Sequence, residues 1–155
     1  FRRVLFRSTL LRNVDHLIAA DDFARRVTGN VAPEQAARIL ADRYGCKVVA
    51  VTLGAQGAVF CCANEVFLSP AFPVDVIDTT GAGDVFHGAY IYGLLQGWRT
   101  PETAQFANAC AAMKCQCMGA RTGIPNRPEV EKFLRARQQS TGLNLDYLHS
   151  NGLLH

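Results

Sequence analysis

Residues 78–86 read DTTGAGDVF and place two glycines and an aspartate where an apolar run passes into a helical pattern. Gly81 and Gly83 allow positive φ angles and a close approach of the backbone to a ligand. Successive backbone N–H groups at the start of a helix, with the helix dipole behind them, form a site for an anion such as phosphate. Asp84 is interpreted either as a helix N-cap or as a base that accepts a proton from an attacking hydroxyl.

Two common nucleotide-binding loops do not match this turn. A Walker A loop has the pattern GxxxxGK[ST], and no lysine follows this pair of glycines. A dinucleotide fingerprint requires glycine or alanine where this chain has Phe86. The sequence therefore predicts an anion site of another class.

The composition is that of a globular domain. The 155 residues are 49% hydrophobic and 19% charged, enough for one domain with an apolar core. The net charge of +3 is small and scattered, so we expect neither nucleic acid nor a membrane surface as a partner. No apolar run approaches the roughly 18 residues that a membrane span needs.

Cysteine spacing favours reduced thiols and a cytoplasmic protein. No pair of CxxC motifs is present, so a zinc site is not expected. The six cysteines are Cys46, Cys61, Cys62, Cys110, Cys115 and Cys117.

Strand and helix patterns alternate along the chain and predict an α/β fold with a mostly parallel sheet. A hairpin is expected to turn at Ala63 and Asn64. The expected strands are 15–20, 47–54, both arms of the hairpin over 58–70, and 72–78. The expected helices are 21–29, 33–44, a long one that follows DTTGAGD and runs to Gly97, 102–118 and one from residue 128.

Three segments together carry a family resemblance. DTTGAGDVFHGAY closely resembles the C-terminal signature of the ribokinase-like (PfkB) carbohydrate kinases. VTLGAQGAVF resembles their strand–GxxG segment, and FANACAAMKCQCMGARTGIP resembles their nucleotide-pocket helix and the loop after it. The resemblance covers residues 14–134. It implies the C-terminal part of a ribokinase-like three-layer α/β/α fold, without the N-terminal half and the lid.

The resemblance and the sequence at the two ends predict a division of the chain into three parts. Residues 9–139 would be the nucleotide-binding and catalytic part of the kinase domain. Residues 1–8 (FRRVLFRS) look like a non-native leader, and residues 140–155 form a tail of uncertain order. Because sugar-contacting residues come mainly from the N-terminal half of such kinases, this fragment alone is expected to be inactive and poorly soluble.

The resemblance also implies an activity. Such a kinase transfers the γ-phosphate of MgATP to a sugar hydroxyl, so the implied partners are a sugar and ATP, with a homodimer of the full-length protein as a further possibility. Asp84 would be the catalytic base, and Gly81, Ala82 and Gly83 would donate backbone N–H groups to the transferring phosphoryl group.

The implied nucleotide contacts come from two regions. Gly54 and Gly57 would let the chain pass close to ATP, with Thr52 at the same strand end; alternatively, these glycines only form a hairpin turn. Asn108 would line the adenine and ribose pocket, or it is simply a polar residue on a helix face.

The metal sites depart in part from the family pattern. Asp78 and Thr80 match a monovalent cation site, with K⁺ as the candidate ion, although Asp78 could equally close the turn. Backbone carbonyls near Lys114, Cys117, Gly119 and Gly123 would complete this site. The NxxE motif that helps organise Mg²⁺ is replaced by ADDF at 20–23, where Asp21 or Asp22 could act through water or only begin a helix.

Two alternative functions stay open. The acceptor could be a nucleoside or another small molecule, because the same signature serves several acceptors. A non-catalytic nucleotide-binding homologue would be consistent with the absent NxxE motif, whereas Asp84 and the two glycines argue against it.

Overall fold

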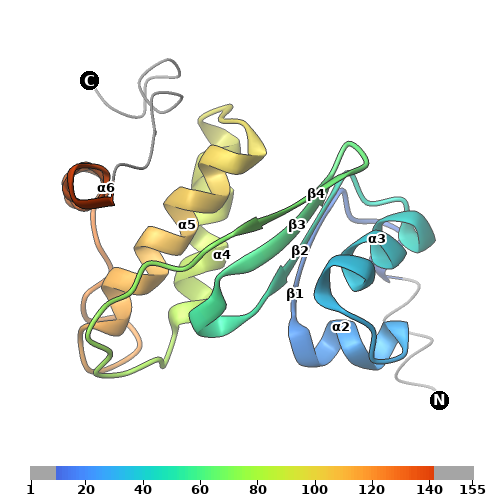
Figure 1. The fold of residues 1–155 in the computed structure, drawn as a ribbon, viewed down its shortest axis with the longest axis horizontal. Helices are drawn as coiled ribbons and strands as arrows, with labels where there is room; N and C mark the ends of the chain where they lie inside the picture. Colours follow the sequence, from blue (N-terminus) through green and yellow to red (C-terminus); the bar gives the residue numbers. More distant parts are fainter. Residues whose placement is uncertain (1–9, 142–155) are drawn as a thin grey trace. The chain divides into compact units, whose positions relative to one another are not determined.

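The computed structural model describes residues 10–141. The predicted leader, residues 1–8, and nearly all of the predicted tail, residues 140–155, lie outside the described residues. The chain divides into two compact units, Phe1–Pro70 and Ala71–His155. Figure 1 shows the elements of each unit in chain order. No helix within residues 10–141 is both long enough and apolar enough to span a lipid bilayer.

In the described residues, the first unit contains a four-stranded sheet flanked by helices α2 and α3. Its elements are β1 (His16–Ala20), α2 (Asp21–Thr28), α3 (Pro33–Tyr44), β2 (Val48–Thr52), the 3₁₀ turn η1 (Gly54–Gln56), β3 (Ala58–Cys62) and β4 (Glu65–Ser69). The strand order is β1-β2-β3-β4, with β1 and β2 parallel and the other two pairs antiparallel. Ala63 and Asn64 form the predicted hairpin turn, and both have positive φ angles.

Local signals explain where these elements begin and end. Pro33 opens α3, and Gly45 ends it in a left-handed conformation with its N–H 2.8 Å from Ala41 O. All residues of β2 except Thr52 are buried, which accounts for the continuous apolar run in the sequence.

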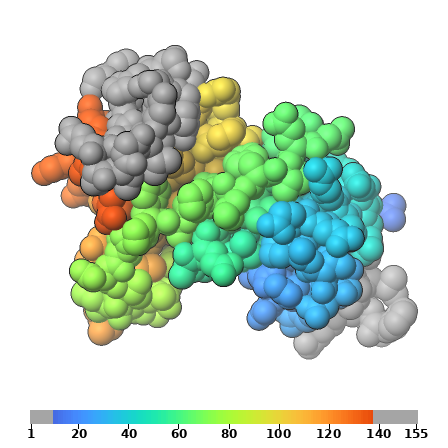
Figure 2. All heavy atoms as spheres, in the orientation of Figure 1, coloured from blue at the N-terminus to red at the C-terminus, as the bar shows by residue number. Residues whose placement is uncertain are grey.

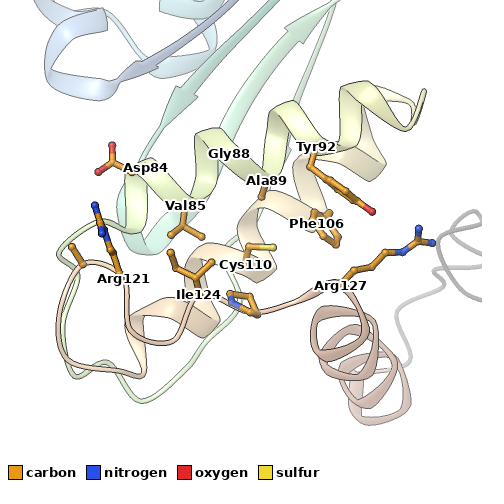
Figure 3. Close-up of a pocket in the computed structure, with 12 residues that line it drawn as sticks. Asp84, Val85, Gly88, Ala89, Tyr92, Phe106, Cys110, Arg121, Ile124 and Arg127 are labelled. Atoms are coloured by element: carbon orange, nitrogen blue, oxygen red, sulfur yellow. The ribbon is translucent and has the colours of Figure 1, made fainter.

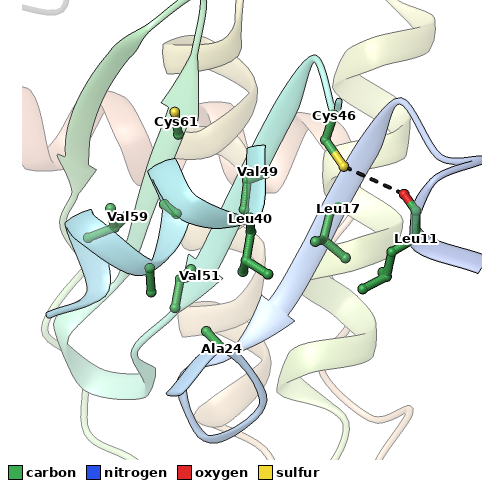
Figure 4. Close-up of a cluster of buried hydrophobic side chains, with 11 residues drawn as sticks. Leu11, Leu17, Ala24, Leu40, Cys46, Val49, Val51, Val59 and Cys61 are labelled. Atoms are coloured by element: carbon green, nitrogen blue, oxygen red, sulfur yellow. Dashed lines mark hydrogen bonds between the residues drawn. The ribbon is translucent and has the colours of Figure 1, made fainter. Parts of the chain in front are cut away.

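The core of the first unit lies between its helices and the sheet. Side chains from α2 and α3 pack against strand residues, and Figure 4 shows this cluster. Its members include Leu17, Ala24, Leu40, Val49, Val51 and Val59. In Figure 2 the atoms of α2 and α3, in blue to cyan, lie over the strands of this unit.

Up to residue 141, where the described part of the chain ends, the second unit is built of helices and the loops that join them. These helices are α4 (Ala82–Leu95), α5 (Thr100–Cys115) and α6 (Arg127–Thr141). Helix α5 begins with a capping box in which the buried Glu102 accepts a hydrogen bond from Arg99 N at 2.9 Å. The rings of Tyr92, Trp98 and Phe106 stack or meet edge to face with centroids 5.1–5.6 Å apart, so aromatic contacts join α4 and α5.

The expected strand at 72–78 is not a strand among the described residues, so this expectation was wrong. Ile77 N and Asp78 N instead donate to Cys115 O, at 2.8 and 3.1 Å, so the segment is attached to the end of α5. Val76 and Ile77 are 60% and 61% exposed. The apolar letters of FPVDVI therefore do not mark a buried strand here.

Helices α4 and α5 pack tightly against each other at Gly93. A Cβ atom there would lie 2.7 Å from Thr103 Cγ2 and 2.8 Å from Thr103 Oγ1, whereas a Cβ at Gly88 on the same helix would meet nothing. We expect Gly93→Ala to lower the free energy of unfolding of the whole protein by about 1–3 kcal/mol through overpacking. Gly88→Ala, the control, should raise it by about 0.5–1 kcal/mol. Denaturant titration measures both, and equal effects of the two variants would contradict this packing.

Candidate functional site

The first turn of α4 is shaped by Gly81. This residue is the N-cap, with φ of 79°, and a Cβ atom on it would lie 2.7 Å from Ala120 O. A side chain at this position would therefore meet both backbone strain and a backbone clash. Glycine at 81 lets the DTTGAGD turn lie against the loop at 119–125.

Three backbone N–H groups in this turn have no partner within the described residues: those of Gly81, Gly83 and Asp84. The Ala82 N–H donates to Thr79 O at 3.1 Å and closes the turn, so it is not the free donor that was predicted. Free N–H groups at a helix N-terminus form an anion site with the helix dipole behind them. The structure therefore keeps Gly81 and Gly83 as free donors and adds Asp84 in place of Ala82.

Asp84 is the third residue of α4, so the helix-cap interpretation is wrong. Its side chain is exposed and makes no hydrogen bond or ion pair with the described residues. His87, one turn later, is exposed and its Nδ1 lies 2.6 Å from Gly83 O, so its ring folds back on the helix. A carboxylate that none of the residues 10–141 engages is available to a ligand beside the free backbone N–H groups.

Asp78 joins the signature turn to the loop after α5. Its Oδ1 accepts the Thr80 N–H at 2.9 Å, and its Oδ2 accepts the Gly119 N–H at 2.7 Å. Hydrogen bonds from the Thr80 backbone, the Thr80 side chain and the Gly119 backbone lower the pKa of Asp78 to about 2. Asp78 therefore does close the turn, as one of its two predicted roles required.

Lys114, in the last turn of α5, is fully buried. Its Nζ donates to the backbone oxygen of Asp78 at 2.9 Å and lies 4.0 Å from Asp78 Oδ2. A buried ammonium needs such partners, because an unpaired charge in the interior is strongly unfavourable. No sequence signal pointed to this contact; a lysine among small residues at a helix end is ordinarily exposed.

The hydrogen bonds of Asp78 predict a pH-dependent loss of stability. A carboxyl group with a lowered folded pKa stabilises the protein above its ordinary pKa of 3.8, and this contribution disappears as the pH falls toward about 2. We expect Asp78→Asn to unfold more easily than the wild type at pH 7, with the difference shrinking between about pH 4 and 2. Thermal unfolding across this range measures it, with Asp75→Asn, at an exposed position, as control. A difference that is constant with pH would contradict this role.

A pocket of about 490 Å³ opens beside Asp84 in the second unit (Figure 3). Its wall is mostly apolar, and the thiol of Cys110 in this wall has its pKa raised to about 12 by burial, so it stays protonated. Arg121 lies at the same end as Asp84 in Figure 3, and its side chain makes no hydrogen bond or ion pair with the described residues. Arg121 is therefore a candidate ligand-binding residue and, after Lys114, the second residue of this region that sequence reasoning missed.

The other predicted residues lie elsewhere. Thr52 ends β2, Gly54 begins η1 and Gly57 follows it, and the two glycines have positive φ angles of 59° and 100°. All three belong to the first unit, where Leu53 N donates to Gly57 O at 2.8 Å. Asn108 is only 5% exposed within α5 and does not line the pocket beside Asp84.

Comparisons with known proteins converge on one family. Residues 6–127 match the model of the pfkB family carbohydrate kinases. The chain is 39% identical over 84 residues to ribokinase from Bacillus subtilis, covering 54% of this chain and 29% of that protein. It is 35% identical over 116 residues to aminoimidazole riboside kinase from Salmonella typhimurium, covering 72% and 36%.

The fold is similar to solved kinases as well. A crystal structure of a candidate ribokinase II from E. coli, in complex with ATP and Mg²⁺, matches with a TM-score of 0.78 and 32% identity. The match covers 87% of this chain and 43% of that one. The ribokinase-like α/β fold expected from the sequence is thereby confirmed. The chain spans less than half the length of each of these three proteins.

Proposed function

The chain belongs to the pfkB family of carbohydrate kinases, and we propose that the whole protein transfers the γ-phosphate of ATP to a hydroxyl group of a sugar. One observation carries the proposal. The Asp84 carboxylate, without a protein partner among the described residues, stands at an N-terminal helix turn with three free backbone N–H groups. A base beside an anion site is the arrangement that phosphoryl transfer to an alcohol requires.

In the proposed reaction, the acceptor hydroxyl gives its proton to the Asp84 carboxylate. The hydroxyl oxygen forms a bond to the γ-phosphorus, and the bond from that phosphorus to the β–γ bridging oxygen breaks, so that ADP leaves. The N–H groups of Gly81, Gly83 and Asp84, aligned with the α4 dipole, would stabilise the negative charge on the transferring group. Arg121 would add positive charge at the same end of the pocket.

We further propose Asp21 as the carboxylate that assists Mg²⁺ in place of the missing NxxE motif. Its Oδ2 lies 2.6 Å from Arg25 Nε, whereas its buried Oδ1 has no hydrogen-bond partner among the described residues. Such an oxygen fits a metal-bound water, and Mg²⁺ bound through phosphates needs few protein carboxylates. Mg²⁺ would neutralise phosphate charge during the transfer.

ATP contacts in the first unit would come from the backbone around η1. Gly54 and Gly57 both have positive φ angles, and no atom within 4 Å occupies the Cβ position of Gly54. A chain without side chains at these positions can pass close to a nucleotide. Thr52, at the end of β2, and Asn108, in α5, remain proposed nucleotide contacts.

A second acceptor class is favoured by one comparison. Aminoimidazole riboside kinase, to which this chain is 35% identical, acts on a riboside as its name states. A nucleoside-like acceptor is therefore the alternative to a free sugar, with the same base and the same anion site.

Initial rates of ADP release test the proposal. The whole protein would be incubated with MgATP and a panel of pentoses, hexoses, phosphosugars and nucleosides. We expect ADP release that depends on one sugar class. Dependence on nucleosides alone would favour the second acceptor class. ATP binding without acceptor-dependent ADP release would show a non-catalytic homologue and overturn the proposal.

A further inference from the structure

The expected potassium site at Asp78 can be tested against the groups that surround it. A monovalent cation at this position would draw on an Asp78 carboxylate oxygen. Both oxygens already accept a backbone N–H, from Thr80 at 2.9 Å and from Gly119 at 2.7 Å. These bonds leave lone pairs on the oxygens, so the hydrogen bonds alone do not exclude a cation.

The ammonium of Lys114 is the group that would disfavour a cation bound at Asp78. It is fully buried, 2.9 Å from the backbone oxygen of Asp78 and 4.0 Å from the carboxylate oxygen Oδ2. Within the described part of the chain, Asp78 is the only acidic side chain within ion-pair distance of Lys114. A second positive charge on the same carboxylate would repel the ammonium in a region of low dielectric constant.

We propose that the Lys114 ammonium supplies the positive charge beside Asp78 that a potassium ion would otherwise supply, so that this protein works without a monovalent cation. The part of this inference that is read from the rate of phosphoryl transfer rests on the proposed function. The part that is read from unfolding temperatures does not. Lys114 is a positioning residue, because it does not reach the N-terminal turn of α4 itself.

Its effect passes through Asp78. Lys114 Nζ donates a hydrogen bond to the backbone oxygen of Asp78. The carboxylate of Asp78 accepts a hydrogen bond from the backbone N–H of Thr80, two residues later. Thr80 directly precedes Gly81, the N-cap of α4. The hydrogen bond to Thr80 therefore holds the backbone in place just before the first turn of α4, which carries the free N–H groups. The same carboxylate holds the Gly119 N–H, which precedes the Ala120 carbonyl packed against Gly81.

The test compares potassium chloride with tetramethylammonium chloride at equal ionic strength, using the whole protein. We expect the wild type to show the same unfolding temperature and the same kcat/KM for ATP in both salts. Lys114→Met keeps an unbranched side chain but removes the charge. We expect this variant to unfold at a higher temperature in potassium, and its kcat/KM to rise about tenfold over tetramethylammonium.

Lys47→Met is the matched control, because the exposed Lys47 pairs only with Asp15, at 3.0 Å, among the described residues. It should gain no potassium response. The proposal is overturned if potassium stabilises or activates the wild type, or if folded Lys114→Met responds to neither salt. If Lys114→Met does not fold, the wild-type comparison decides alone. A protein without kinase activity would refute the proposed function, while unfolding temperatures would still decide the role of Lys114.

Discussion

Asp84→Asn is expected to lower kcat of the whole protein by about 10³-fold, while the Kd for ATP stays within the error of the wild-type value. The amide is nearly isosteric with the carboxylate but cannot accept the proton of the acceptor hydroxyl. Because the Asp84 carboxylate makes no hydrogen bond or ion pair with the described residues, its replacement should disturb little of the fold. Steady-state ADP release and ATP titration measure the two quantities.

A control is needed for the charge that this change removes from a helix N-terminus, which is worth about 0.3–1 kcal/mol of stability. Glu34 is the acidic residue in the first turn of α3 and is exposed. Glu34→Gln removes the same kind of charge and should leave kcat unchanged. If Asp84→Asn retained near-normal turnover, Asp84 would not be the base.

Gly81→Ala is expected to remove both stability and activity. A methyl group at this position would lie 2.7 Å from Ala120 O, and the φ of 79° is unfavourable for alanine. We expect a loss of about 2–5 kcal/mol in the free energy of unfolding. We also expect kcat to fall about 10²–10³-fold, because the free amides would be displaced.

Gly45→Ala separates the two causes. Gly45 has a φ of 72°, close to that of Gly81, but no atom lies within 4 Å of its Cβ position. It should lose only about 1–2 kcal/mol, the cost of the left-handed conformation, with kcat unchanged. Equal losses of stability and activity in both variants would show that backbone strain alone explains the effect of Gly81→Ala.

Elements whose boundaries are signalled locally could be predicted from the sequence. Pro33 and Gly45 delimit α3, and the positive φ angles of Ala63 and Asn64 form the expected hairpin. The α/β fold class followed from the alternation of such elements. The described part of the sheet holds one parallel pair, β1 with β2, and the hairpin adds the antiparallel strands.

Features that depend on contacts distant in the sequence could not be predicted. The segment at 72–78 has the apolar letters of a strand, but the hydrogen bonds of Ile77 and Asp78 go to Cys115 O at the end of α5. The burial of Lys114 depends on the Asp78 carbonyl, 36 residues earlier in the chain.

The candidate site was predicted in its motif but not in its geometry. The glycines and Asp84 were recognised from DTTGAGD, whereas the rejection of Asp84 as the helix cap required the structure, in which Gly81 is the N-cap of α4. The engagement of the Ala82 N–H by Thr79 O is a detail of turn geometry that the letters do not contain. Arg121 was missed because a lone arginine in a loop carries no spacing signal.

The central claim is that this protein transfers a phosphoryl group from ATP to an acceptor hydroxyl with Asp84 as the base. The most direct measurement is the ratio of phosphorylated acceptor to ADP in a reaction catalysed by the whole protein. The acceptor is the one that the rate panel identifies, and both products are quantified by ³¹P NMR. The account predicts one phosphate ester for each ADP in the wild type, and neither product above background in Asp84→Asn. ADP formed with inorganic phosphate instead of the ester, or ester formed equally by both proteins, would contradict it.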